Sequence, residues 1–410
     1  MSCGAKIVWM AASGSAIGGA ESRMVKVAST LVDEKKIQSV RFIITPELNN
    51  AYQNHPSLKV LLDHPKISIY ERKRIRSLAE KILRKIYQKA GIHIRFMDKL
   101  LLKLDSWDRF YNEMITPTED VLHCYMGDEA RNGAVLFSQL NENRVIIEIT
   151  NHRYLDRVSN EVKQLLKSGQ KAQNLTIVSV SKKVYDGWNS QFSSDWFEDR
   201  NIQNSVYKGA FLMNDMIQSD VEKENIIIFP HRFVPPKNGI LFSRVVHELF
   251  EEGLLKNWKV LFRGRGPEQG EMEKNLKKWI KKGTAEISFS NRLHQELQKS
   301  KIAVSLIETG SYPSQSIFEA MQAGCVLLLS SSGNTKEELN HPSISYTSLD
   351  KEKIKQELIK LTIKEEEELQ KSGNEMKEYY QWFIRNRNQL DEIKVMYGII
   401  HENLVNNARQ

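Results

Sequence analysis

The sequence predicts an α/β protein made of two doubly wound domains, each a mainly parallel sheet covered by helices on both faces. Three observations support this. The chain has 410 residues, enough for two or three domains of ordinary size. Short apolar runs alternate with helical patterns along almost the whole length. Most of these runs are continuously apolar, as expected for parallel strands that are buried on both faces.

The composition excludes several other classes. Hydrophobic residues make up 40% and charged residues 27%, with 21 Gly and 10 Pro, so collagen-like, low-complexity and disordered chains are excluded. The three cysteines, Cys3, Cys124 and Cys325, lie far apart without a CxxC pair. This spacing argues against a disulfide framework or zinc site and favours a reducing, cytoplasmic location. No stretch approaches the 18 apolar residues of a membrane span.

The strand pattern divides the chain into a first domain over residues 1–208 and a second over 225–384, joined by a polar, irregular segment. We also expect a C-terminal helix at about 385–410 that can pack back on the first domain. The strands expected in the first domain cover 5–10, 41–45, 67–70, 121–125, 144–150 and 175–180. Those expected in the second domain cover 225–230, 259–264, 285–289, 302–307 and 325–330.

One segment holds most of the positive charge. The chain carries a net charge of +8, and Arg72 to Lys103 contains eleven basic residues against Glu80 and Asp98, a local net of +9 (11 − 2). Its apolar residues have helical spacing up to Gly91. Such a helix can lie on an anionic membrane surface, or it can be a solvated helix packed on its own domain. Nucleic acid fits less well, because few aromatic residues accompany the charge.

A first anion-binding motif follows the first strand of the second domain. Arg232 and Lys237 stand five residues apart just beyond this strand, with two prolines in the turn between them. Ligands of open α/β sheets bind outside the carboxyl ends of the strands. Fixed cations there suit a phosphate or diphosphate, although two basic residues on a loop are, taken alone, usually only surface charges.

A second motif lies in the segment GSYPSQSIFEAMQAGC. Pro313, Ser314 and Ser316 predict a helix start, whose backbone amides and dipole form an anion site. Glu319 lies further along this helix, where a carboxylate can accept hydrogen bonds from ribose hydroxyls. Gly324 is placed to end the helix. By itself the segment is equally compatible with an ordinary αβ unit.

Together these residues resemble the nucleotide-sugar-dependent glycosyltransferases of the GT-B fold, particularly glycosyltransferase family four. The resemblance extends over nearly the whole chain, in order: GGAE at Gly18 and Gly19, R-x4-K at Arg232 and Lys237, G-x-G-P within residues 262–267, and Glu319 as the second Glu of E-x7-E. One departure is clear, since Ser311 occupies the place of the first Glu. Glu308, three residues earlier, is the nearest replacement; alternatively Ser311 or backbone amides contact the donor sugar.

The resemblance implies a role for each residue. Gly18 and Gly19 let the backbone approach the donor phosphate or the acceptor. Arg232 and Lys237 bind the diphosphate, assisted by amides at Ser314, Gln315 and Ser316, while Glu319 contacts the donor. A histidine after a first-domain strand contacts the donor sugar, and His152 occupies such a position. His123 lies inside a strand and is expected in the core, and His231 either touches the diphosphate or only packs.

The predicted function is transfer of a sugar, with retention and without a cofactor, from a nucleoside diphosphate donor to a glycan acceptor. If the basic segment docks on a membrane, that acceptor is lipid-linked. No metal is predicted, because the sequence contains no D-x-D motif. P-loop, nucleophile-elbow and HExxH motifs are also absent from the sequence. Two alternatives stay open: a non-catalytic carbohydrate-binding scaffold of the same fold, and a sugar-nucleotide epimerase.

Overall fold

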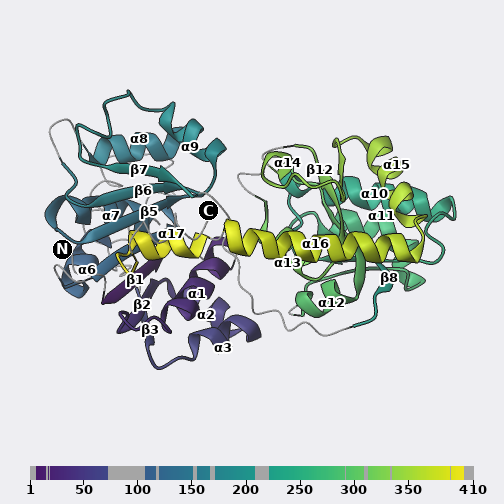
Figure 1. The fold of residues 1–410 in the computed structure, drawn as a ribbon, viewed down its shortest axis with the longest axis horizontal. Helices are drawn as coiled ribbons and strands as arrows, with labels where there is room; N and C mark the ends of the chain where they lie inside the picture. Colours follow the sequence, from purple (N-terminus) through teal and green to yellow (C-terminus); the bar gives the residue numbers. More distant parts are fainter. Residues whose placement is uncertain are drawn as a thin grey trace, which may run out of the picture. The chain divides into compact units, whose positions relative to one another are not determined.

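The fold is seen in a computed structural model (Figure 1). It describes residues 6–14, 17, 19–72, 107–116, 120–150, 155–166, 171–207, 221–290, 292–308, 313–332, 335–387 and 389–400. The chain forms two compact units. The first runs to Tyr207 and also includes the C-terminal segment from Leu390, whereas the second runs from Lys208 to Gln389.

The described part of the first unit contains a parallel sheet of seven strands in the order β3-β2-β1-β4-β5-β6-β7. The strands are β1 (Ile7–Ala12), β2 (Ser39–Ile44), β3 (Ile67–Glu71), β4 (Asp120–Met126), β5 (Arg144–Ile149), β6 (Leu175–Ser179) and β7 (Gln203–Val206). The helices are α1 (Gly19–Leu31), α2 (Pro46–Gln53), α3 (Pro56–Leu62), α6 (Trp107–Met114), α7 (Asp128–Leu140), α8 (Leu155–Leu165) and α9 (Lys182–Asn189). Each strand connection within the unit therefore has the crossover that parallel pairing requires.

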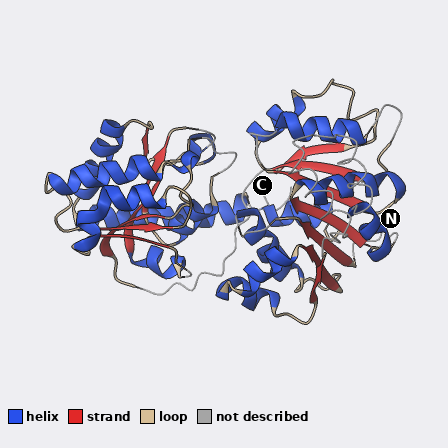
Figure 2. Cartoon of the chain, turned by 180° about the vertical axis from the view of Figure 1, so that it is seen from behind, coloured by secondary structure: helices blue, strands red, loops and turns tan. Residues whose placement is uncertain are grey.

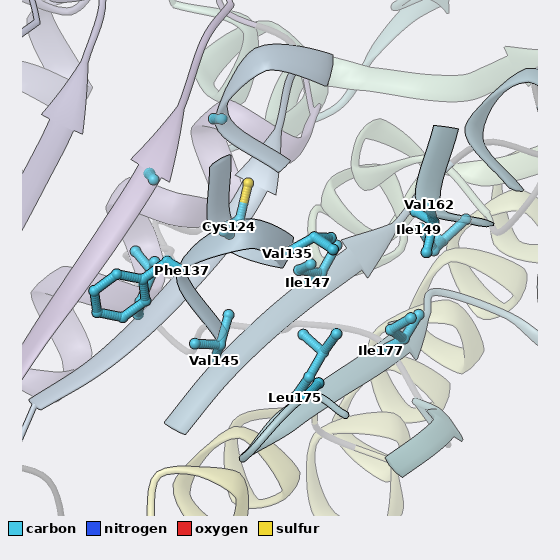
Figure 3. Packing of buried hydrophobic residues seen from close by; sticks show 14 of the residues in the cluster. Cys124, Val135, Phe137, Val145, Ile147, Ile149, Val162, Leu175 and Ile177 are labelled. Carbon is cyan, nitrogen blue, oxygen red and sulfur yellow. The ribbon is translucent and has the colours of Figure 1, made fainter. Parts of the chain in front are cut away.

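One face of this sheet packs against α6 to α9. Figure 3 shows Cys124 of β4 and Val145 and Ile147 of β5 close to Val135 and Phe137 of α7. Successive side chains of a strand point to opposite faces. His123 of β4 and Glu148 of β5 therefore lie on the other face, which α1 and the C-terminal segment cover.

The described part of the second unit contains a parallel sheet of six strands in the order β10-β9-β8-β11-β12-β13. The strands are β8 (Glu224–Phe229), β9 (Lys259–Arg263), β10 (Ala285–Ser288), β11 (Ser300–Ser305), β12 (Val326–Ser330) and β13 (Ile344–Thr347). The helices are α10 (Gly239–Glu251), α11 (Gln269–Lys281), α12 (Leu293–Lys299), α13 (Gln315–Gln322), α14 (Thr335–Glu338), α15 (Lys351–Thr362) and α16 (Glu366–Asn386). Helices α10, α11 and α15 cover one face and α12, α13 and α16 the other, and Figure 2 shows helices on both faces of each sheet.

All eleven strands predicted from the sequence are present, with ends displaced by up to two residues. The structure adds β7 and β13, which the sequence analysis missed. Both are four-residue edge strands and half or more of their residues are not buried, so neither forms the continuous apolar run that reveals the others.

The C-terminal segment is not one continuous helix. Helix α16 ends at Asn386 and α17 (Gln389–Met396) follows it, with the chain turning at Tyr397. Lys36 Nζ donates to the carbonyl of Ile399 at 2.7 Å, and Arg144 Nη1 donates to that of Met396 at 2.8 Å. These bonds attach the segment to the first unit.

The prediction for the basic segment is wrong for its first residue. Arg72 is only 7% exposed, and its guanidinium lies 4.6 Å from the centre of the Trp107 ring. A buried cation on an indole face cannot reach lipid headgroups, so Arg72 packs within its own unit. The other residues of the predicted basic helix, from Lys73 to Lys103, lie outside the described residues.

Candidate functional site

The candidate site lies at the carboxyl ends of β8 and β11, the two central strands of the second unit. The connection after β8 leads to α10 on one face of the sheet, and that after β11 leads to α13 on the opposite face. The strand order reverses at this point. Ligands of doubly wound sheets bind in the crevice that such a reversal opens.

The turn after β8 brings two cations to this edge. Arg232 is exposed, and Lys237 ends the short 3₁₀ turn Pro235–Lys237. Asn238 follows with a φ of 56°, a conformation that asparagine tolerates better than most residues. The side-chain amide Nδ2 of Asn238 donates to the carbonyl of Leu306 at 2.8 Å, and this bond attaches the turn to the end of β11.

Glu308 belongs to the same edge. Its backbone N–H donates to the carbonyl of Pro236 at 3.0 Å, and the residue is exposed. The structure thus brings Glu308 beside the turn that carries Arg232 and Lys237. Ser311, the other predicted sugar contact, lies outside the described residues.

Helix α13 starts at the predicted place. Ser314 is its N-cap residue, with extended φ and ψ of −68° and 151°, and its hydroxyl lies 2.9 Å from that of Ser316. The hydroxyl of Ser314 makes no capping bond, so the first amides, including those of Gln315 and Ser316, remain available to an anion. Glu319 is half-buried on the second turn. The helix ends at Gln322, and Gly324 follows two residues later with a φ of 71°, as predicted for a C-terminal glycine.

The turn after β9 explains why the G-x-G-P motif needs glycine. A Cβ atom on Gly264 would lie 2.0 Å from the carbonyl oxygen of His231, and one on Gly266 would lie 2.2 Å from that of Phe233. The N–H of Phe233 also donates to the carbonyl of Arg265 at 3.1 Å. The turns after β8 and β9 are therefore in direct backbone contact.

The electrostatics of the edge favour an anion. Arg232 is exposed and forms no ion pair with any residue that the structure describes. Burial, and secondarily the charge of Lys237, hold the pKa of His231 well below its ordinary value, so the imidazole is neutral. Burial, with the charge of Glu271, raises the pKa of Glu268 in the turn after β9.

The structure describes little of what was predicted at the first unit's strand ends. Gly19 is the exposed first residue of α1, with open space where a Cβ would stand. Gly18 and His152 lie outside the described residues. Their predicted contacts with the donor stay predictions.

Sequence reasoning missed a buried polar cluster in the first unit. The Glu148 side chain is fully buried and pairs with Arg23 of α1. His123 Nε2 lies 3.1 Å from Glu148 Oε1, and Tyr207 OH donates to the same oxygen at 2.9 Å. His123 Nδ1 lies 2.6 Å from Tyr397 OH. The expectation that His123 is a core histidine is confirmed, and the charged Glu148 inside an apolar strand was the available signal for the rest.

The described residues show neither a metal cluster nor a membrane-spanning helix. Among the residues that the structure describes, no three His, Cys, Asp or Glu side chains form a group suited to a metal ion. No helix within the described ranges is both long and apolar enough to cross a bilayer.

Residues 214–380 match the family described as glycosyl transferases group 1. This region includes Arg232, Lys237, Glu308 and Glu319, the described residues of the candidate site. Comparison with curated proteins gives no match.

Solved structures of similar fold cover nearly the whole chain. A mutant of S. aureus TarM, in complex with fondaparinux, alpha-GlcNAc-glycerol and UDP, has a TM-score of 0.67 at 10% identity, covering 98% of this chain and 100% of that one. The pneumococcal O-GlcNAc transferase GtfA, in complex with UDP and GlcNAc, has a TM-score of 0.67 at 9% identity, covering 97% and 100%. Anabaena HepE, in complex with UDP and glucose, has a TM-score of 0.63 at 11% identity, covering 98% and 99%. The predicted GT-B fold of two Rossmann-like domains is confirmed.

Proposed function

We propose that this chain is a glycosyltransferase that moves a sugar from a nucleoside diphosphate donor to a glycan acceptor. The observation that carries the proposal is the cationic edge at the strand-order reversal of the second unit. There Arg232, Lys237 and the first turn of α13 lie inside the region that matches glycosyl transferases group 1. The UDP bound in three structures of the same fold supports a nucleoside diphosphate as the donor's leaving group.

The reaction breaks the bond between the sugar's anomeric carbon and the diphosphate oxygen, and that oxygen keeps the electron pair. Arg232 can hold the diphosphate with two parallel hydrogen bonds, while Lys237 acts as a compact point charge. Amides of Gln315 and Ser316 add fixed dipoles at the positive end of α13. These groups stabilise the charge that grows on the leaving group, which is where catalytic stabilisation is most effective.

Other residues would bind the donor's neutral parts. The Glu319 carboxylate is suited to accept hydrogen bonds from two ribose hydroxyls. Glu308 or Ser311 would contact the donor sugar, and His152 of the first unit would do the same. The acceptor hydroxyl forms the new bond at the anomeric carbon, and its proton passes to the departing diphosphate oxygen. We propose retention of the anomeric configuration and membership of glycosyltransferase family four, on the motif order alone.

We further propose that the enzyme needs no metal ion, since Arg232 and Lys237 supply the positive charge that a metal-bridged diphosphate site would provide. The test is incubation with UDP-, GDP- and ADP-sugars and a panel of glycan acceptors, in the presence and absence of EDTA. We expect transfer with one donor, unchanged by EDTA. Loss of transfer in EDTA, restored by a divalent cation, would contradict metal independence; no transfer or hydrolysis with any donor would contradict the proposed activity.

One observation favours a second candidate, a carbohydrate-binding scaffold without turnover. Ser311 occupies the position at which glycosyltransferase family four, which the sequence resembles, has the first Glu of its E-x7-E motif. Such a scaffold would bind glycans without releasing free nucleotide from any donor. The third reading, an epimerase, would release nucleotide and an altered free sugar when no acceptor is present.

We propose a lipid-linked acceptor at an anionic membrane surface, reached from the cytoplasm through the basic segment. With Arg72 buried, the ten basic residues from Lys73 to Lys103 carry this proposal. Each headgroup contact is worth about 1 kcal/mol and weakens with salt. We expect binding to vesicles with anionic lipid that is lost at 1 M salt, or when Arg76, Lys81, Arg84 and Lys85 are changed to Glu. Equal partitioning onto neutral and anionic vesicles, or none onto either, would contradict it.

A further inference from the structure

His231 is the buried histidine of the candidate site, and the proposed chemistry has not used it. It follows β8 directly, precedes Arg232 and is only 5% exposed. Its ring meets that of Phe229 edge-on, with centroids 5.1 Å apart. A histidine buried beside the cationic turn either fills space or holds a neighbouring group in place.

The imidazole faces the start of α13. Its Nδ1 atom lies 3.5 Å from the hydroxyl oxygen of Ser316, which in turn lies 2.9 Å from that of Ser314. The 3.5 Å separation is at the upper limit for a hydrogen bond. Hydrogen bonds of this kind are often long in ligand-free sites and shorten when the ligand binds. Nε2 is buried and has no hydrogen-bond partner among the described residues, so Nδ1 is the ring's polar contact.

The backbone at His231 is held in place by its neighbours. Its carbonyl oxygen lies against Gly264, where any Cβ atom would clash at 2.0 Å. The turn after β8 is also bonded to the end of β11 through Asn238. Because these contacts fix the position of His231, its ring can define where the Ser316 hydroxyl lies.

The imidazole is neutral, because burial and the charge of Lys237 keep its pKa low. A neutral ring carries one N–H and one acceptor nitrogen. With the proton on Nδ1, the ring donates to the Ser316 oxygen. Nε2, the buried nitrogen without a partner among the described residues, then carries no proton. The Ser316 hydroxyl then keeps its own proton to donate elsewhere.

We propose that His231 is a positioning residue for the donor diphosphate. Its Nδ1–H holds the Ser316 oxygen, so that the Ser316 hydroxyl proton points toward a phosphate oxygen bound at the start of α13. This inference rests on the proposed function, because it assumes that a nucleoside diphosphate binds there. It links the turn that carries Arg232 and Lys237 to the helix that supplies the amides.

The first experiment compares two amide replacements. Asn places its side-chain amide near the position of Nδ1, whereas Gln places it near that of Nε2. The ligand is UDP, GDP or ADP, whichever binds the wild type. We expect the affinity of His231→Asn to stay within about threefold of the wild-type value. His231→Gln should bind about tenfold more weakly, because it loses one hydrogen bond to a phosphate oxygen. In a transfer assay the Gln variant should raise KM far more than it lowers kcat. Asn as impaired as Gln, or Gln as tight as wild type, would overturn the inference.

A second experiment starts from a variant that leaves His231 unchanged. Ser316→Ala should itself weaken nucleotide binding about tenfold. Adding His231→Gln should cause no further loss of affinity, because both changes remove the same hydrogen bond from Ser316 to the phosphate. Wild-type binding by Ser316→Ala, or losses that multiply in the double variant, would contradict the coupling. His247→Gln on α10 is the matched histidine control and should leave the affinity unchanged. Absence of binding by the wild type would instead contradict the proposed function.

Discussion

The two units differ in how their charged groups are compensated. In the first unit, the Glu148 carboxylate is surrounded by Arg23, His123 and Tyr207, all supplied by the chain itself. In the second, Arg232 faces solvent without an ionic partner among the described residues, and His231 has an unpartnered ring nitrogen. A cluster whose charges compensate one another stabilises the fold, whereas polar groups left uncompensated at a strand-order reversal are available to a ligand.

The largest effect should come from breaking the first cluster. Glu148→Ala removes the carboxylate that compensates Arg23 and accepts from Tyr207. Leaving a buried charge without its partner costs about 3 to 5 kcal/mol of unfolding free energy. Urea unfolding should show this loss when it is monitored by hydrogen exchange of the backbone amides of β4 and β5. Glu142→Ala, an exposed acid just before β5, is the control and should unfold like wild type. A loss below about 1 kcal/mol would mean that the cluster is not structural.

The second effect concerns turnover, not stability. Lys237→Ala should lower kcat about 100- to 1,000-fold, because a fixed charge that stabilises a developing anion is worth about 3 to 4 kcal/mol. Its thermal unfolding midpoint should stay at the wild-type value. Lys256→Ala, an exposed lysine after α10, is the matched control and should keep full activity. Unchanged turnover in the Lys237 variant would refute the assigned role.

A smaller effect separates the ribose contact from the phosphate contacts. Glu319→Gln should weaken nucleoside diphosphate binding about tenfold, since hydrogen bonds to a charged group contribute about 1.5 to 3 kcal/mol. Inorganic pyrophosphate has no ribose, so its binding should not change. A 2′,3′-dideoxy nucleotide should bind wild type and variant equally. Equal loss for pyrophosphate would show that Glu319 acts on the phosphates or on the helix.

The smallest effect is a pH dependence of the first unit's stability. Burial and the charge of Arg23 hold the pKa of His123 well below its ordinary value of about 6.5. The unfolded chain therefore binds the proton more readily than the folded one, so the contribution of His123 is complete above about pH 6.5 and is lost as the pH falls below it. Urea midpoints at pH 7.5 and 5.5 should show this decline in wild type and less of it in His123→Gln. An equal decline of the urea midpoint in both proteins would mean that titratable groups other than His123 cause the pH dependence.

The sequence predicted the strands well where burial on both faces makes them an almost continuous apolar run, as in β12. It failed at β7 and β13, where an edge position removes that signal. The places of Arg232 and Lys237 after β8, and of Glu319 on α13, could be predicted because each stands at a fixed distance from a strand or helix end. The Glu148 cluster could not, because Arg23, His123, Tyr207 and Tyr397 meet only after the sheet has formed. Arg72 was misjudged for the same reason, since only the fold brings Trp107 beneath it.

The central claim is that the cationic edge of the second unit, which carries Arg232 and Lys237, binds a nucleoside diphosphate. Calorimetric titration of the full chain with UDP, GDP, ADP and pyrophosphate tests this claim without an acceptor or an assumed sugar. We predict saturable binding of at least one of the three nucleotides to the wild type, abolished in the Arg232→Ala, Lys237→Ala double variant and retained in Glu148→Gln. Saturable binding to none of them, or equal binding by the double variant, would contradict the claim.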